Sequence, residues 1–93
     1  MTVRKMTLEE IKEEHFSTKE VLLTSHERHQ RQHKLTVAMA ITNSQHEPVW
    51  LHIMLASGQI AEIYSSLIDY EDDYVEVRGG FGIPLRAICD VGV

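Results

Sequence analysis

The sequence predicts an α+β domain in which one or two N-terminal helices pack on a small antiparallel five-stranded barrel or rolled sheet. Three observations lead to this fold class. Two helix-capping patterns open the sequence, apolar residues alternate with other residues after position 35, and glycine or proline turns separate short segments in the second half. The 93 residues suffice for one core. We therefore expect a single domain, with residues 1–34 as its helical part and residues 35–93 as its β part.

The helical part is predicted from two capping boxes, in which a hydroxyl caps a backbone N–H and a carboxylate reaches back. Thr7-x-x-Glu10 starts a helix over about residues 8–15, and Ser17-x-x-Glu20 marks a second possible start. We favour a helix from there to residue 34 with a solvated second half, although a brief strand over residues 21–23 stays open.

The β part begins where the apolar period changes to two. Leu35, Val37, Met39 and Ile41 alternate with smaller or polar residues, which favours a strand, although the Ala and Met content also permits a helix. After Pro48, alternation from Val49 to Leu55, a turn at Gly58 and the segment 60–64 predict a hairpin.

The remaining strands follow from turn chemistry. Residues 69–73 form an acidic turn, and Val75 and Val77 then point to one face of the next strand. Gly79 and Gly80 supply positions suited to positive φ in a tight turn. Residues 83–91 hold the last strand or two.

Residues 49–91 resemble the Sm-like and SH3-like small barrels. The matching features are the first hairpin, a bent second strand over residues 60–68, the acidic turn, the Val-x-Val strand and a closing Ile-Pro-Leu-x-x-Ile-x-x-Val. The closing run is similar to the short 3₁₀ joint between the last two strands of such barrels. The chain also resembles the YolD-like family of small bacterial proteins, in which an α-helical N-terminal region accompanies a barrel of this kind. The Asp-x-x-Asn base-binding turn of RNA-binding Sm rings is absent, so the resemblance does not imply RNA binding through such turns.

Composition and charge limit where the chain could contact nucleic acid and in which compartment we expect it. The chain is 43% hydrophobic and carries a net charge of −5. Residues 1–46 hold seven Lys/Arg and six Asp/Glu, whereas residues 47–93 hold two and eight, so a phosphate backbone would have to contact the N-terminal half. Cys89 is the only cysteine and no segment has the length of a signal peptide core or a membrane span, so we expect a cytoplasmic protein.

Two sets of residues are candidate binding surfaces. Arg28, Arg31 and Lys34 form a stripe at three-residue spacing that suits phosphate or an acidic partner. Trp50 points either outward or beneath the N-terminal helix, and we favour covered packing. If it is exposed, Trp50, Met54 and Tyr64 form the best interaction patch of the chain.

We expect neither catalysis, nor a cofactor, nor a metal. His26, His29 and His33 share one helical stripe but have no partner motif for a zinc site, so a solvated face is favoured over a metal site. Cys89 has no activating base in the sequence pattern and is expected to fill the core. The sequence thus favours a small binding or regulatory adaptor that acts through protein contacts or as a homodimer. A nucleic-acid-associated accessory protein is the alternative, and a histidine-mediated metal-binding protein is the second alternative.

Overall fold

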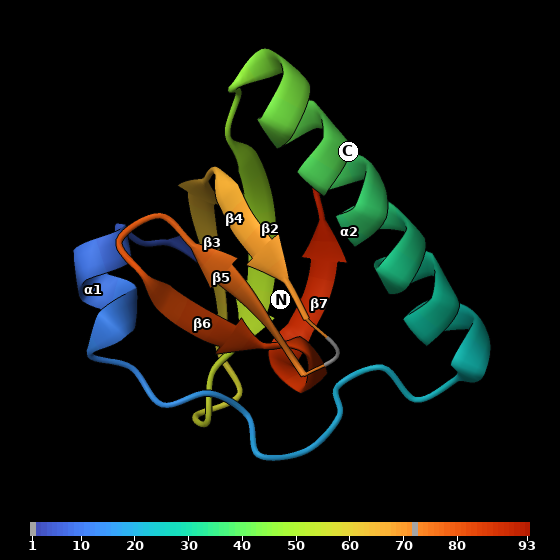
Figure 1. The fold of residues 1–93 in the computed structure, drawn as a ribbon. Helices are drawn as coiled ribbons and strands as arrows, with labels where there is room; N and C mark the ends of the chain where they lie inside the picture. Colours follow the sequence, from blue (N-terminus) through green and yellow to red (C-terminus); the bar gives the residue numbers. More distant parts are fainter. Residues whose placement is uncertain (1, 72) are drawn as a thin grey trace.

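The computed structural model describes residues 2–71 and 73–93, and these form a small α+β domain (Figure 1). One long helix and seven strands in two sheets make up the described chain. The helical segments are α1 (Leu8–Lys12), α2 (Ser25–Gln45) and the 3₁₀ helix η1 (Leu85–Ala87). The strands are β1 (Val3–Lys5), β2 (Val49–Met54), β3 (Ile60–Ser65), β4 (Leu67–Tyr70), β5 (Tyr74–Val77), β6 (Phe81–Pro84) and β7 (Ile88–Val91).

The strands form a four-stranded sheet in the order β1-β3-β2-β7 and a three-stranded sheet in the order β4-β5-β6. Ser66 alone separates β3 from β4, so the chain passes from one sheet to the other at this point. The described strands form no closed barrel. β1 was not predicted, and it pairs in parallel with β3, whereas the sequence predicted an antiparallel sheet throughout.

The hairpins predicted after Pro48 are confirmed. β2 and β3 pair antiparallel around the turn at Gly58, which has φ 91°. Gly79 and Gly80, with φ of 95° and 81°, make the turn between β5 and β6. Residue 72 of the predicted acidic turn lies outside the described residues.

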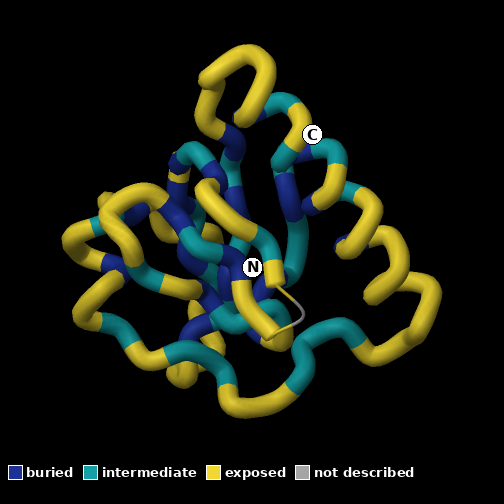
Figure 2. The backbone as a smooth tube through the Cα atoms, viewed as in Figure 1, coloured by how far each residue is buried: buried dark blue, intermediate teal, exposed yellow. Residues whose placement is uncertain are grey.

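The core lies between the inner faces of the two sheets, where the buried backbone gathers in Figure 2. β2 alternates buried and half-buried side chains along its length. Val75 and Val77 of β5, predicted to share one face, are both fully buried. Ile11 of α1 and Leu35 of α2 join the same core. Helices and sheets therefore share one hydrophobic interior.

The first predicted helix is confirmed but shorter. The side chain of Thr7 accepts a hydrogen bond from the Glu10 amide, and Glu10 reciprocates, so the capping box is present. The helix ends at Lys12 rather than near residue 15. The second predicted start, at Ser17, is wrong: residues 13–24 run without regular helix along the ends of the sheets, where the Ser17 amide donates to the Met54 carbonyl at 3.0 Å.

Helix α2 begins at Ser25, behind a capping box of Thr24 and Glu27, and continues through the segment predicted to be a strand. Its buried residues are Arg31, Leu35, Ala38 and Thr42. Their spacing of four, three and four follows the helical period, so a helix buries them together, whereas a strand would not. The strand prediction over residues 35–41 was therefore wrong, and the described strands after the helix begin at Val49. None of the described helices is long and apolar enough to cross a bilayer.

Candidate functional site

The outer face of the four-stranded sheet carries the aromatic patch predicted from sequence. Trp50 and Tyr64 are register partners on β2 and β3, so they lie side by side on the face turned away from the core. Tyr64 is 59% exposed. Trp50 is half-buried, with His52 and Gly92 against its ring.

Two neighbours fix the Trp50 indole. The His52 ring stacks on it with centroids 4.3 Å apart. On the β7 side, a Cβ at Gly92 would lie 2.2–2.4 Å from indole atoms, so the absent side chain leaves the space that the ring occupies. The Gly92 amide also donates to the Trp50 carbonyl at 2.8 Å. Trp50 is therefore a positioned platform and not a freely mobile side chain.

A second apolar row crosses the same face at the other end of the strands. Met54 pairs in register with Ile60, and Ile60 pairs with Val3 of β1. Met54 and Ile60 are half-buried and Val3 is 38% exposed. The predicted patch of Trp50, Met54 and Tyr64 thus lies on one face, but in two rows rather than in one cluster.

A polar row separates these two apolar rows. His52 Nε2 lies 2.9 Å from Glu62 Oε1, and both side chains are largely buried within the sheet surface. Asp90 is the register partner of His52 on β7, and Lys34 Nζ of α2 reaches its Oδ1 at 2.7 Å. Burial works to raise the pKa of Asp90, but the Lys34 and Val91 hydrogen bonds outweigh it and hold that pKa below its ordinary value. Each carboxylate of this row therefore has a bonding partner, Glu62 in His52 and Asp90 in Lys34.

The predicted basic stripe is not a free surface. Arg31 is buried, with 8% exposure, and its guanidinium donates to both carboxylate oxygens of Glu20 at 2.6 and 2.7 Å and to the Ile88 carbonyl at 3.1 Å. Arg28 donates to the Leu22 carbonyl, and Lys34 is the partner of Asp90. Of the predicted stripe, Arg31 is thus buried, Lys34 is half-buried and Arg28 stays exposed. Their bonds fasten α2 to residues 20–22 and to β7.

The histidine stripe lies on exposed surface of α2. His26, His29 and His33 line a shallow concavity of about 310 Å³ together with Gln30 and Lys34. Within residues 2–71 and 73–93, no group of three or more His, Cys, Asp or Glu residues is placed to hold a metal ion.

The sequence predicted that Cys89 fills the core, but the residue is only half-buried. A register shift between β2 and β7 turns it toward the side of α2. Burial, followed by the charge of Asp90, raises the pKa of its thiol. A raised pKa keeps the thiol protonated near neutral pH, and a protonated thiol is a poor nucleophile.

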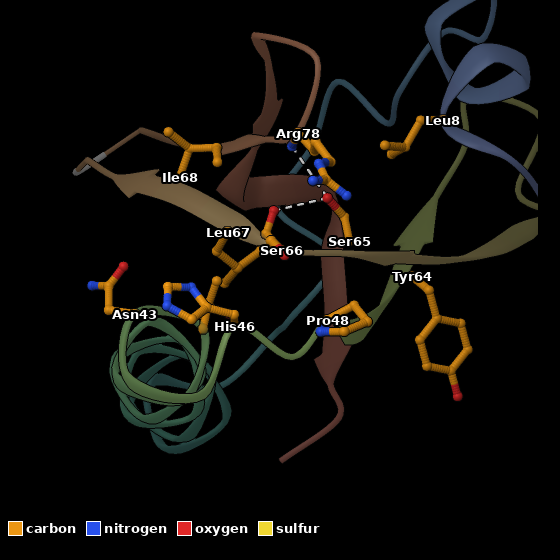
Figure 3. Close-up of a pocket in the computed structure, with 11 residues that line it drawn as sticks. Leu8, Asn43, His46, Pro48, Tyr64, Ser65, Ser66, Leu67, Ile68 and Arg78 are labelled. Atoms are coloured by element: carbon orange, nitrogen blue, oxygen red, sulfur yellow. Dashed lines mark hydrogen bonds between the residues drawn. The ribbon is translucent and has the colours of Figure 1, made fainter.

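A further cleft, of about 640 Å³, lies where the C-terminal end of α2 meets the β3–β4 junction (Figure 3). We call it the α2–β4 cleft. Asn43 and His46 line it from the helix end, Ser66 and Leu67 from the strands, and Arg78 from the turn after β5. Sequence reasoning missed this site, because these residues meet only through the packing of α2 beside β4.

Family models, curated proteins and solved structures were all compared with the chain, and none matches it. The function is therefore argued from the two surfaces just described, the outer face of the four-stranded sheet and the α2–β4 cleft.

Proposed function

We propose that this protein is a non-catalytic binding protein that self-associates through the outer face of its four-stranded sheet. The observation that carries the proposal is the cross-strand pair of Trp50 and Tyr64, an aromatic platform whose tyrosine is 59% exposed. Aromatic residues of this kind are enriched at the centres of protein interfaces, where they bury large areas at little cost in side-chain entropy.

The buried apolar residues of the two helices belong to the core and not to this platform. The buried residue of α1, Ile11, packs into the core, and α2 lies against β7 and β4. Two apolar rows therefore remain available to a partner.

The charge of the face favours a second copy of the chain as that partner. The protein has a net charge of −5, which opposes association of two copies in general. On the outer face, however, Glu62 is bound to His52 and Asp90 to Lys34. Burying this face leaves no carboxylate of these pairs without its partner, and a two-fold dimer is the commonest symmetric assembly.

The size of the face limits the affinity. The sheet has two six-residue strands, flanked by β1 with three residues and β7 with four. At about 3.3 Å per residue and about 4.8 Å between strands, its face is at most about 20 Å by 15 Å. Such a face buries less than the roughly 800 Å² per partner of a standard stable interface. We therefore expect a reversible dimer with a dissociation constant in the micromolar range.

Sedimentation equilibrium tests the proposal. A species near twice the 10.7 kDa chain mass should appear as the concentration rises. Tyr64→Lys should shift the equilibrium toward monomer by about tenfold or more, because it places a charge in the aromatic row. Tyr74→Lys is the matched control, since Tyr74 is also exposed, at 40%, but lies on the other sheet.

Two outcomes would sink the proposal. One is a strictly monomeric protein at high micromolar concentration. The other is a dimer that Tyr64→Lys and Tyr74→Lys weaken equally, which would show that association does not use the outer face.

The resemblance to SH3-like and Sm-like barrels stays part of this proposal. In its support, β2 pairs with both β3 and β7, β3 bends at Ser66 into β4, and η1 joins β6 to β7. Determination of the solution structure would test whether the two sheets meet as in those barrels.

A further inference from the structure

The α2–β4 cleft has two polar ends and an apolar middle. In Figure 3, Arg78 lies on one side of the strand segment that carries Ser66, and Asn43 and His46 lie on the other. Leu67 and Pro48 also line the cleft, between and beside these polar groups. Its volume of about 640 Å³ lies in the range of small-molecule sites, about 300–1,000 Å³.

The charge of the lining favours an anion. Arg78 is one of only two Lys/Arg among residues 47–93, which hold eight Asp/Glu. No Asp or Glu lines the cleft, and no ion pair joins the Arg78 guanidinium to a carboxylate of the described residues. The other cation of this half, Arg86, donates to the Ser17 carbonyl at 2.9 Å. The exposed guanidinium of Arg78 thus has no carboxylate partner among the described residues, in an otherwise acidic half.

Thr42 supplies an independent observation. It also lines the cleft, it is 94% buried, and its hydroxyl has no hydrogen-bond partner among the described residues. Thr36 and Ser44 on the same helix donate instead to the carbonyls of Gln32 and Ala40. Buried polar atoms without a partner are rare in folded proteins, because each costs the free energy of its lost hydration. The Thr42 oxygen is closed to solvent in this structure, so a ligand oxygen in the cleft would satisfy the hydroxyl once the side chain turns toward it.

We propose that the α2–β4 cleft binds a small monocarboxylate with an apolar body and a second oxygen acceptor. The carboxylate pairs with Arg78, whose planar guanidinium matches it with two parallel hydrogen bonds. One guanidinium balances one negative charge, so a monoanion suits the cleft better than a phosphate dianion. The second oxygen accepts from the Asn43 amide and, once its side chain turns toward the cleft, from the Thr42 hydroxyl, and the body lies along Leu67 and Pro48. The cleft and the proposed dimer face share Tyr64, which lines both.

Titration of ¹⁵N-labelled protein with N-acetyl-L-leucine tests the proposal, since this probe carries a carboxylate, an isobutyl group and an acetyl carbonyl. Backbone resonances of residues 43, 46, 66 and 67 should shift, with a dissociation constant of about a millimolar or below. N-acetyl-L-leucine amide, which lacks the charge, should bind about tenfold more weakly, and inorganic phosphate should also bind more weakly.

Two variants test which residues at the polar ends of the cleft bind the ligand. Arg78→Gln should weaken binding of N-acetyl-L-leucine by about tenfold or more, whereas Arg86→Gln is the matched control and should not. Thr42→Val should weaken binding by about fivefold and yet raise the melting temperature of the ligand-free protein, because it removes the unpaired hydroxyl. Thr36→Val, the same change at a bonded and exposed threonine, should do neither.

Three results would overturn the proposal. These are an absence of resonance shifts at roughly tens of millimolar probe, equal binding of the acid and its amide, and an Arg78→Gln variant that binds like the parent protein. If Thr42→Val lowers the melting temperature and leaves affinity unchanged, the hydroxyl has a structural role and the second acceptor is wrong.

Discussion

Arg31 and Thr42 lie at opposite ends of one buried stripe on α2, and the protein treats them differently. The Arg31 guanidinium is bound by two carboxylate oxygens of Glu20 and by the Ile88 carbonyl. The Thr42 hydroxyl has no partner among the described residues. A buried polar group with all its hydrogen-bond partners inside the protein stabilises the fold. A buried polar group without a partner needs a hydrogen bond from a ligand or a solvent molecule.

The two halves of α2 are also held by different forces. Residues 23–30 are exposed, so the N-terminal half of the helix has little apolar surface to bury. It is fastened by the bonds of Arg28, Arg31 and Lys34. The C-terminal half buries Leu35 and Ala38 in the core. The comparison between a polar anchor and an apolar anchor can be tested at each end.

The largest expected effect is at the polar anchor. Arg31→Ala should lower the free energy of unfolding by about 3 kcal/mol, since it leaves the Ile88 carbonyl and a partly buried Glu20 without their donor. Urea denaturation followed by circular dichroism measures this loss. Arg28→Ala is the control, because Arg28 is exposed and makes a single bond, and it should cost less than about 1 kcal/mol. Equal, small losses would show that Arg31 is not an anchor.

At Thr42, the opposite end of the buried stripe, a substitution should change the free energy of unfolding in the opposite direction. Thr42→Val should raise the free energy of unfolding by about 1 kcal/mol without ligand, because a methyl group replaces a hydroxyl that no group satisfies. The urea midpoint of this variant is compared with that of Thr36→Val. A loss of stability specific to Thr42→Val would mean that the hydroxyl already has a partner in solution.

The smallest expected effect is a loss of stability at acid pH. Burial works to raise the pKa of Glu20, but the hydrogen bonds from Arg31 and the Leu22 amide outweigh it, so that pKa is lowered, as is the pKa of Asp90. A lowered folded-state pKa stabilises the fold above the unfolded value of about 4, and this contribution disappears as the pH falls through the folded-state value. Each carboxylate is partly exposed, so each loss should stay below about 1 kcal/mol.

Urea midpoints between pH 7 and pH 3 measure the acid loss. Glu20→Gln should flatten this part of the stability profile, because the amide does not titrate. Glu13→Gln, at an exposed site with no ion pair among the described residues, should leave the profile unchanged. A parent protein that gains stability toward pH 3 would contradict the prediction.

The sequence predicted the fold well where local chemistry decides the structure. The turns at Gly58 and Gly79 and the capping box at Thr7 need only their own neighbours, and all three are confirmed. It failed over residues 35–41, where apolar residues at every second position resemble a strand. The helical stripe there includes Ala38 and Thr42, a small and a polar residue, so hydrophobicity alone does not reveal it.

The candidate site was predictable only in part. Alternation placed Trp50 and Tyr64 on outward faces, and their adjacency needed only the hairpin register. The partner of Arg31 could not be predicted, because Glu20 was interpreted as a helix-capping residue, whereas it lies outside any helix. The α2–β4 cleft depends on packing between residues as distant as Thr42 and Arg78, for which the sequence contains no local signal.

The parallel pairing of β1 with β3 has a consequence for the order of folding. Val3 and Ile60 are register partners although 57 residues separate them, and Arg31 and Ile88 are also 57 apart. The β2–β3 hairpin closes a short loop and can form early, whereas such distant pairings must close long loops and slow the search. On the ribosome, β1 emerges before β3 and must wait for it, so β1 should be among the last of the described strands to be fixed in place.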